Sequence, residues 1–172
     1  MPVRHGVFAP GNYYHLYNRG VSRQNIFFSD ENFLFCTRLI EKYARAHLIA
    51  VIAYCLMPNH YHLLVRQDGQ AAVSRFISVV FNTYVQAVNR QLGRSGTLFQ
   101  GRFLHVQVER EEYLVHLCRY IHLNPVVAGL VRNPEDWAFS NYLECVGNGR
   151  APCRTGPLSL TTSRVRRTMS GL

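Results

Sequence analysis

The sequence predicts an α+β fold built on one antiparallel sheet. Segments with the 3.6-residue apolar period of a helix alternate with short apolar runs typical of strands, and turn residues separate the two kinds of segment. A length of 172 residues and a hydrophobic fraction of 48% suit a single globular domain with a sizeable core.

The first half of the chain is expected to supply three strands and one helix. The first strand is predicted at Tyr13–Asn18. A helix follows from Ser29 or Asp30, either of which can cap its start, to about Ala46. The apolar run "LIAVIAYCLM" predicts a buried strand, and the turn signal Pro58-Asn59 joins it to its partner "HYHLLVR".

The second half is expected to add two helices and one strand. A helix is predicted from Ala71 to about Leu92, and "GRSGTLFQGRF" leads into a strand that ends near Val108. The last helix is predicted from Glu111 to Leu123. Asn124-Pro125 should stop it, because a residue before proline avoids the helical conformation. This β-α-β-β-α-β order with a C-terminal helix is the ferredoxin-like pattern.

The charge balance indicates an anionic polymer as partner. The formal net charge is +9, and every one of the 19 basic residues except Lys42 is an arginine. The planar fork of arginine suits phosphate groups and stacks on bases. A high-GC genome would explain the choice of arginine over lysine, but not the nine excess charges.

The domain is expected to span residues 1–146, with a basic, flexible tail at residues 147–172. No apolar run is long enough to cross a bilayer, and the start of the chain lacks the apolar core of a signal peptide. We therefore expect a bacterial cytoplasmic protein, nucleoid-associated when bound to DNA, with no membrane partner.

Two histidines lie in the strand "HYHLLVR". His60 and His62 share one face, because residues i and i+2 of a strand point the same way. Two imidazoles on a rigid strand can form half of a metal site. This spacing alone is a weak signal, since two hydrogen-bonded core histidines would give the same pattern.

The last predicted helix carries complementary residues. His116, Tyr120 and Asn124 recur every four residues and form a stripe beside the apolar one. The apolar stripe itself consists of Leu114, Leu117, Cys118 and Ile121. Tyr120 therefore lies at the margin of the core, where a tyrosine can also simply extend its hydroxyl to solvent.

Together these residues suit phosphoryl transfer. A divalent ion held by His60, His62 and the carbonyl oxygen of Asn124 would polarise a phosphate. Tyr120 would attack the phosphorus and leave a 5′-phosphotyrosine and a free 3′-hydroxyl. A second 3′-hydroxyl would reverse the step and join DNA. The donor set suits Mn²⁺ or Zn²⁺, and phosphoryl chemistry in cells commonly uses Mg²⁺, so Mg²⁺ or Mn²⁺ is expected.

The motifs "YHLYNRG", "MPNHYHLLV", "YIHLNPVVAGLV" and "DWAFSNY" resemble those of the single-tyrosine HUH transposases, where U is a hydrophobic residue. This family includes the IS200-like insertion-sequence transposases and the REP-associated tyrosine transposases. The resemblance covers roughly residues 10–145 and implies a ferredoxin-like fold. It also implies metal-dependent cleavage and joining of single-stranded DNA, and recognition of hairpins near the cut.

Transferred to this sequence, the resemblance assigns His60 and His62 as the HUH pair and Tyr120 as the nucleophile, which makes the last helix the catalytic helix. It assigns Asn124 as a metal ligand. That ligand is commonly glutamine in the insertion-sequence branch, so "YIHLNP" fits the REP-associated branch better. The resemblance leaves open whether the protein is a monomer or a homodimer.

Further DNA contacts are expected from basic residues in or beside turns and at the edge of the last helix. For each arginine singly, a solvated surface charge is the simpler interpretation, but together they would give a salt-dependent electrostatic footprint. These candidates are Arg19, Arg23, Arg66, Arg94, Arg102 and His116.

Three alternatives remain beside an active transposase. A replication initiator or relaxase shares the HUH strand, but such proteins usually carry further histidines or a second tyrosine at helical spacing. A domesticated hairpin-DNA-binding protein would have an inactive site. The presence of all four site residues, His60, His62, Tyr120 and Asn124, argues against this alternative. An RNA-binding ferredoxin-like module would need stacking aromatic residues on its central strands.

Overall fold

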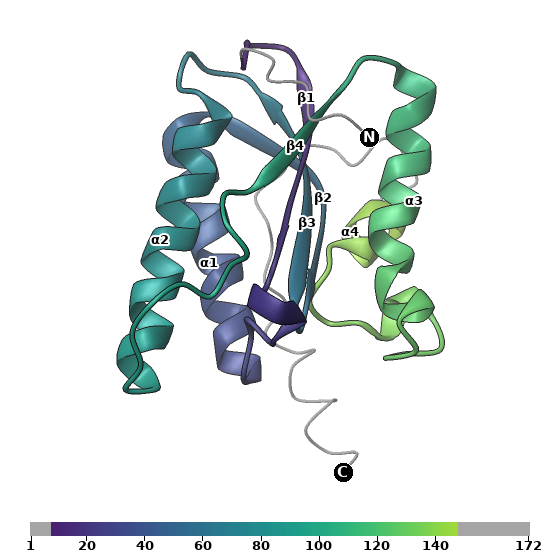
Figure 1. The fold of residues 1–172 in the computed structure, drawn as a ribbon. Helices are drawn as coiled ribbons and strands as arrows, with labels where there is room; N and C mark the ends of the chain where they lie inside the picture. Colours follow the sequence, from purple (N-terminus) through teal and green to yellow (C-terminus); the bar gives the residue numbers. More distant parts are fainter. Residues whose placement is uncertain (1–7, 148–172) are drawn as a thin grey trace.

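The computed structural model describes residues 8–147, so that nearly all of the predicted tail, residues 148–172, lies outside the described residues. Four strands form one antiparallel sheet in the order β2-β3-β1-β4, which is the ferredoxin-like order, and the predicted fold class is confirmed (Figure 1). The strands are β1 (Tyr13–Arg19), β2 (Ile49–Met57), β3 (His60–Gln67) and β4 (Leu104–Val108).

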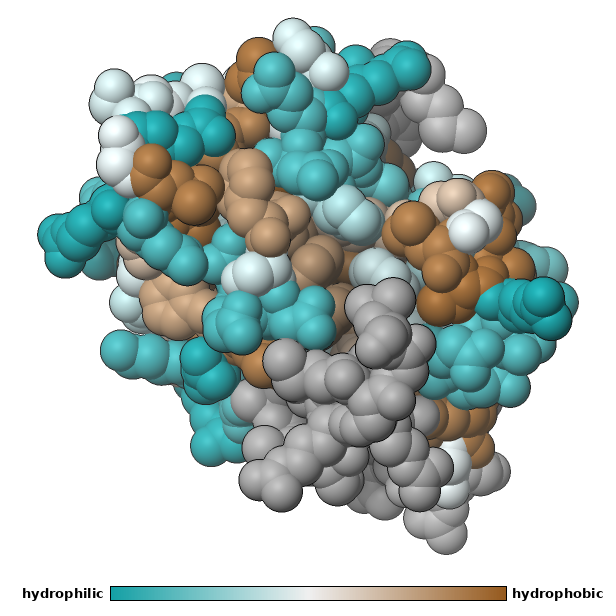
Figure 2. All heavy atoms as spheres, turned by 90° about the horizontal axis from the view of Figure 1, so that it is seen from below, coloured by the Kyte–Doolittle hydropathy of each residue, from teal (hydrophilic) through white to brown (hydrophobic). Residues whose placement is uncertain are grey.

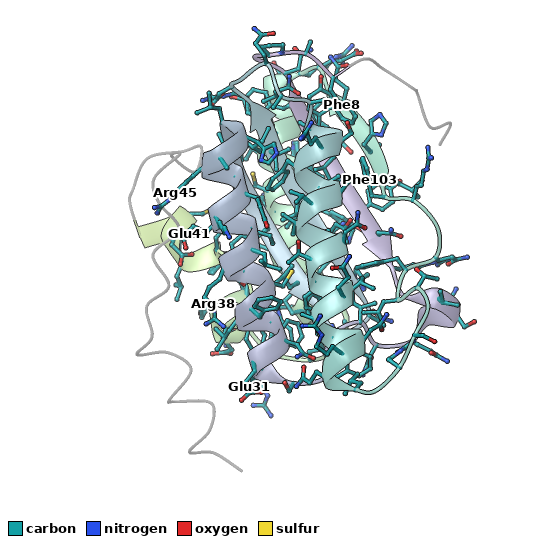
Figure 3. All side chains as sticks on the ribbon, turned by 90° about the vertical axis from the view of Figure 1, so that its left-hand side faces the viewer. Phe8, Glu31, Arg38, Glu41, Arg45 and Phe103 are labelled. Carbon is teal, nitrogen blue, oxygen red and sulfur yellow. The ribbon has the colours of Figure 1, made fainter. Side chains whose placement is uncertain are left out.

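Helices cover both faces of this sheet (Figure 1). On one face α1 (Asp30–His47) and α2 (Val73–Gln91) bury their apolar sides against Leu16, Leu63 and Val65 of the central strands. Figure 3 looks onto these two helices side by side, with Glu31, Arg38, Glu41 and Arg45 on the solvent side of α1. The other face is covered by α3 (Glu111–Val127) and the short α4 (Tyr142–Gly147).

The segment after α3 is tied to the sheet through η2 (Pro134–Asp136) and the residues that follow it. The Trp137 indole donates a hydrogen bond to the carbonyl oxygen of Leu56 at 3.0 Å, and the Phe139 ring stacks on Phe33 with centroids 4.1 Å apart. These contacts anchor the return of the chain to the core. No helix among residues 8–147 combines the length and the apolar character that crossing a membrane requires.

The predicted end of the last helix is wrong. α3 continues through Pro125 to Val127 rather than ending at Leu123. Proline removes the N–H that would bond to the carbonyl oxygen of Ile121. The side-chain amide of Asn124 donates to that oxygen at 3.4 Å and to the carbonyl oxygen of Tyr120 at 2.7 Å, and so replaces part of the lost bonding.

A tight turn follows β1 and includes η1 (Val21–Arg23). Ser22 and Arg23 both adopt positive φ, 51° and 61°. Gly20 has an ordinary φ of −64°, so it is required for space and not for its backbone angles. A Cβ atom on Gly20 would overlap the carbonyl oxygen of Gln24.

We therefore expect Gly20→Ala to lower the free energy of unfolding by about 1–3 kcal/mol, because the turn must open to admit a methyl group. Gly147→Ala is the matched control, since nothing lies within 4 Å of a Cβ atom placed there. Urea denaturation of both variants provides the measurement. Equal stability of Gly20→Ala and Gly147→Ala would contradict the crowding inferred for the turn.

Candidate active site

The pairing of β1 with β3 brings the predicted site residues to one end of the sheet. In the antiparallel register Tyr17 lies opposite His62, and Arg19 lies opposite His60. Residues directly opposite each other point to the same face. Both histidines therefore face the layer that contains α3, as the alternation in the sequence predicts.

Burial of its apolar stripe fixes α3 over this face. Leu114, Leu117 and Ile121 pack against Cys55 and Met57 of β2, among others. The stripe of Tyr120 and Asn124 lies beside this contact. The Tyr120 ring is 54% exposed and meets the His62 ring edge-on, with centroids 5.4 Å apart.

Asn124 joins the helix to the histidine strand. Its amide group donates to the helix carbonyl oxygens of Tyr120 and Ile121, and its side chain lies close enough to the His60 ring to raise the pKa of that imidazole. The amide nitrogen is thus committed to the backbone, which leaves the carbonyl oxygen of Asn124 for the space beside the histidine strand. The proline-containing helix end therefore places the Asn124 carboxamide beside the strand that carries the histidines.

Each of the two histidines has a partner for its Nδ1 atom. His60 Nδ1 lies 2.7 Å from Oδ1 of Asn59, and His62 Nδ1 lies 3.0 Å from Nε2 of His15. These contacts leave both Nε2 atoms available to a ligand between this end of the sheet and α3. His15 was not among the residues predicted from the sequence. Its signal lay in the spacing of His15 and Tyr17, which share a face of a central strand beside the histidine strand.

Burial keeps these imidazoles neutral. It lowers the pKa of His62 to about 3, with smaller contributions from His15 and His60, and lowers the pKa of His15 to about 4. The pKa of His60 is also lowered by burial, and the nearby Asn124 side chain, whose oxygen can accept from a protonated ring, opposes that change. Neutral imidazole is the form that can bind a metal ion.

The donor set fits a divalent cation. His60, His62 and Asn124 line the same cleft, and hydrogen bonds orient each side chain, as is usual around metal ligands. Within residues 8–147 no group of three or more His, Cys, Asp or Glu side chains is placed to hold a metal ion. The fit therefore depends on Asn124 as the third protein ligand.

A cleft of about 610 Å³ opens between this end of the sheet and α3. Three of the predicted DNA contacts, Arg19, Arg23 and Arg102, line it together with both histidines, and no described lining residue is acidic. Gln100 holds Arg19 in place through a 2.7 Å hydrogen bond from the guanidinium Nε. Figure 2 views the molecule from the end that carries η1, where hydrophilic side chains cover much of the surface. The remaining lining residues are Tyr17, Asn18, Asn59, Gln100, Leu104, Tyr120 and Asn124.

The structure places the other three predicted DNA contacts outside this lining. Arg66 lies opposite Tyr13, at the other end of β1, and forms an ion pair with Asp68. Arg94 follows α2, and His116 is exposed on α3. The geometry therefore joins three of the six candidates to the histidines, and the role of the other three stays a prediction.

Three other tyrosines, which could be considered as nucleophiles, are positioned differently from Tyr120. Tyr84 is fully buried and donates its hydroxyl to the carbonyl oxygen of Ile26 at 2.6 Å. Tyr61 is buried on the opposite face, where it stacks on Phe81. Tyr113 is 48% exposed but does not line the cleft.

Residues 9–124, more than half of the chain, match the family model described as "Transposase IS200 like". The chain belongs to this family of transposases. The match ends at Asn124, so the segment in common with the family includes both histidines and Tyr120.

Two individual proteins are also similar to this transposase-family chain. A Haemophilus influenzae protein provisionally named a REP-associated tyrosine transposase is 28% identical over 101 residues, which are 53% of this chain and 57% of the relative. The chain thus matches little more than half of that relative's length. A solved structure of a REP-associated tyrosine transposase bound to a REP hairpin is 20% identical, with a TM-score of 0.73. That similarity covers 94% of this chain and 93% of the solved chain and supports the fold.

His122, two residues after Tyr120 on α3, has a structural role. It is buried and lies 2.9 Å from Oδ1 of Asn141. Asn141 also accepts from the Tyr54 backbone and donates to the carbonyl oxygen of Ile52, both in β2. Through Asn141, His122 therefore links α3 to β2 close to Tyr120 in the sequence.

The buried histidines predict a stability that depends on pH. The pKa values of His62 and His15 are about 3 and about 4, below the ordinary value of 6.5. The unfolded chain then binds more protons than the folded chain once the pH falls below about 6.5. The free energy of unfolding should decrease with falling pH, by up to about 1.4 kcal/mol per pH unit for each histidine.

Urea denaturation between pH 7.5 and 4.5, with a chelator present, measures this dependence. His62→Leu should show a shallower decrease than the wild type, because one of the histidines whose pKa burial lowers most is gone. A wild-type free energy of unfolding that stays constant or rises as the pH falls would show that these rings are not held neutral.

Proposed function

We propose that the protein cleaves and rejoins single-stranded DNA next to hairpins of the REP or insertion-sequence-end type, through a 5′-phosphotyrosine on Tyr120. Mg²⁺ or Mn²⁺ would be held by His60, His62 and Asn124. The observation that carries the proposal is the position of a half-exposed tyrosine beside His62, in a cleft lined by arginines.

Different residues of the chain bind the DNA and position the nucleophile. Arg19, Arg23 and Arg102 attract the backbone of the strand and compensate its charge. When bound, a divalent ion supplies a Lewis acid that polarises the scissile phosphate. The packing of Leu117 and Ile121 holds the Tyr120 ring at the cleft, so that its hydroxyl approaches a phosphate lying over the histidines.

The free energy of the phosphodiester bond that is cleaved is retained in the bond between phosphorus and Tyr120. The Tyr120 oxygen forms a bond to phosphorus as the bond between phosphorus and the 3′-oxygen breaks. The phenol loses its proton, and a proton ends on the released 3′-hydroxyl. Attack by another 3′-hydroxyl on the phosphotyrosine reverses each of these changes, joins two strands and regenerates Tyr120.

The hairpin part of the proposal is supported by the relatives. The H. influenzae relative is provisionally named for an association with REP elements, and the solved chain of similar fold is bound to a REP hairpin. Single-stranded DNA beside the hairpin is proposed as the substrate of cleavage, because a phosphate in a flexible strand can enter a cleft of about 610 Å³ and align with Tyr120.

The sheet offers little support for an RNA-binding module. Such modules stack bases on exposed aromatic residues of the central strands. Here α1 and α2 cover one sheet face and α3 covers the other. Tyr14 and Tyr61 of the central strands are buried, so that neither is available as a stacking surface.

The test uses a labelled DNA hairpin with a single-stranded flank, the full chain and Mn²⁺. We expect Tyr120→Phe to form no covalent adduct, a loss of at least about 100-fold, while it binds the hairpin normally. Removal of one half-exposed hydroxyl should cost no more than about 1 kcal/mol of stability. Tyr113→Phe is the matched control, because Tyr113 lies on the same helix with similar exposure but outside the cleft.

Mass spectrometry of the peptide covering residues 111–132 locates the adduct. The proposal requires it on Tyr120 in the wild type, with a perfect duplex of the same sequence left uncut. An adduct on Tyr113 or Tyr84 would refute the assignment of the nucleophile. Hairpin binding without any adduct in the wild type would instead favour a domesticated DNA-binding protein.

A further inference from the structure

We infer that His15 is a positioning residue, which supplies the hydrogen-bond acceptor that His62 needs in order to present its Nε2 atom to a metal ion. This inference rests on the proposed metal centre and extends it to a residue that does not line the cleft.

The position of the ring proton decides which nitrogen of His62 can bind a metal ion. A neutral imidazole carries one ring proton, so a lone pair on Nε2 requires the proton to lie on Nδ1. His62 is only 7% exposed, and an N–H group buried without a partner is unfavourable. Nδ1 of His62 lies 3.0 Å from Nε2 of His15, and among the described residues no other group hydrogen-bonds it.

The backbone holds His15 where this contact requires it. β1 is a central strand, and His15 lies opposite Leu64 of β3 and Val106 of β4. His62 is the diagonal neighbour of His15, since it lies opposite Tyr17, two residues further along β1. The two rings stack with centroids 5.1 Å apart and an angle of 27° between their planes.

The other candidate ligand shows a parallel arrangement. Nδ1 of His60 lies 2.7 Å from Oδ1 of Asn59, and the Asn59 amide in turn donates to the carbonyl oxygen of Arg23 at 3.2 Å. The two histidines therefore both have Nδ1 engaged and Nε2 left for the cleft. This common pattern indicates a built metal-ligand shell rather than two unrelated core contacts.

The hydrogen bond between two imidazoles has two proton arrangements. In one, His62 donates from Nδ1 to His15 and its Nε2 can bind a cation. In the other, His15 donates to His62, whose own proton then occupies Nε2 and blocks that atom. Binding of a cation at Nε2 of His62 selects the first arrangement, and His15 makes it possible by accepting.

The test compares two substitutions by isothermal titration with Mn²⁺. His15→Phe keeps a ring of similar shape and removes the acceptor, and it should weaken Mn²⁺ binding by about 10–100-fold. His15→Gln offers a carbonyl oxygen and should restore part of that loss. His47→Phe is the control, because His47 ends α1 on the opposite side of the sheet and should leave the affinity unchanged.

A second readout does not depend on any variant. Nitrogen NMR of the histidine-labelled wild type with Zn²⁺, a diamagnetic ion, should show the His62 ring proton on Nδ1. Coordination through Nδ1, or equal Mn²⁺ affinity of the wild type and folded His15→Phe, would overturn the inference. Equal weakness of His15→Phe and His15→Gln would overturn it too. Absence of Mn²⁺ binding in the wild type would instead refute the metal centre itself, and the inference with it.

Discussion

The candidate site depends on the antiparallel register between β1 and β3. This register sets Tyr17 opposite His62 and Arg19 opposite His60, and so places His15 diagonally beside His62. A slip of one residue would turn the side chains of β3 to the other face. His60 and His62 would then face the core beneath α1 and α2, where Tyr61, Leu63 and Val65 now pack. The hydrophobic pattern of β3 therefore fixes the position of its polar residues.

The same burial that fixes the register makes the histidines chemically useful. His15 and His62 are buried and neutral, and each needs hydrogen-bond partners within the protein. Those partners come from neighbouring structure, with His15 serving His62 and Asn59 serving His60. On the other side of the cleft, Pro125 frees a helix carbonyl oxygen and the Asn124 amide turns toward it. Local requirements of a strand and a helix thus bring His60, His62 and Asn124 to one cleft.

Much of this arrangement could be predicted from the sequence. The strands and the first two helices have strong periodicity, so that their bounds are predicted within about two residues, and the i, i+2 and i, i+4 spacings correctly place His60 with His62 and Tyr120 with Asn124. The end of α3 could not be predicted, because the rule that a residue before proline avoids the helical conformation takes no account of the side-chain hydrogen bonds of Asn124. The contact of His15 with His62 could not be predicted either, because it depends on how β1 pairs with β3. For the same reason the sequence did not separate Arg19, beside the histidines, from Arg66, at the far end of the same strand pair. The role of residues 147–172 stays a prediction.

The central claim is that two imidazole nitrogens and one carboxamide oxygen hold a divalent ion beside Tyr120. Anomalous scattering from crystals grown with Mn²⁺ tests it directly. The account predicts one strong peak at bonding distance from Nε2 of His60, Nε2 of His62 and Oδ1 of Asn124, on the side that faces the Tyr120 ring. A peak bound through Nδ1 of either histidine, or a well-ordered Mn²⁺ elsewhere with this cleft empty, would contradict it.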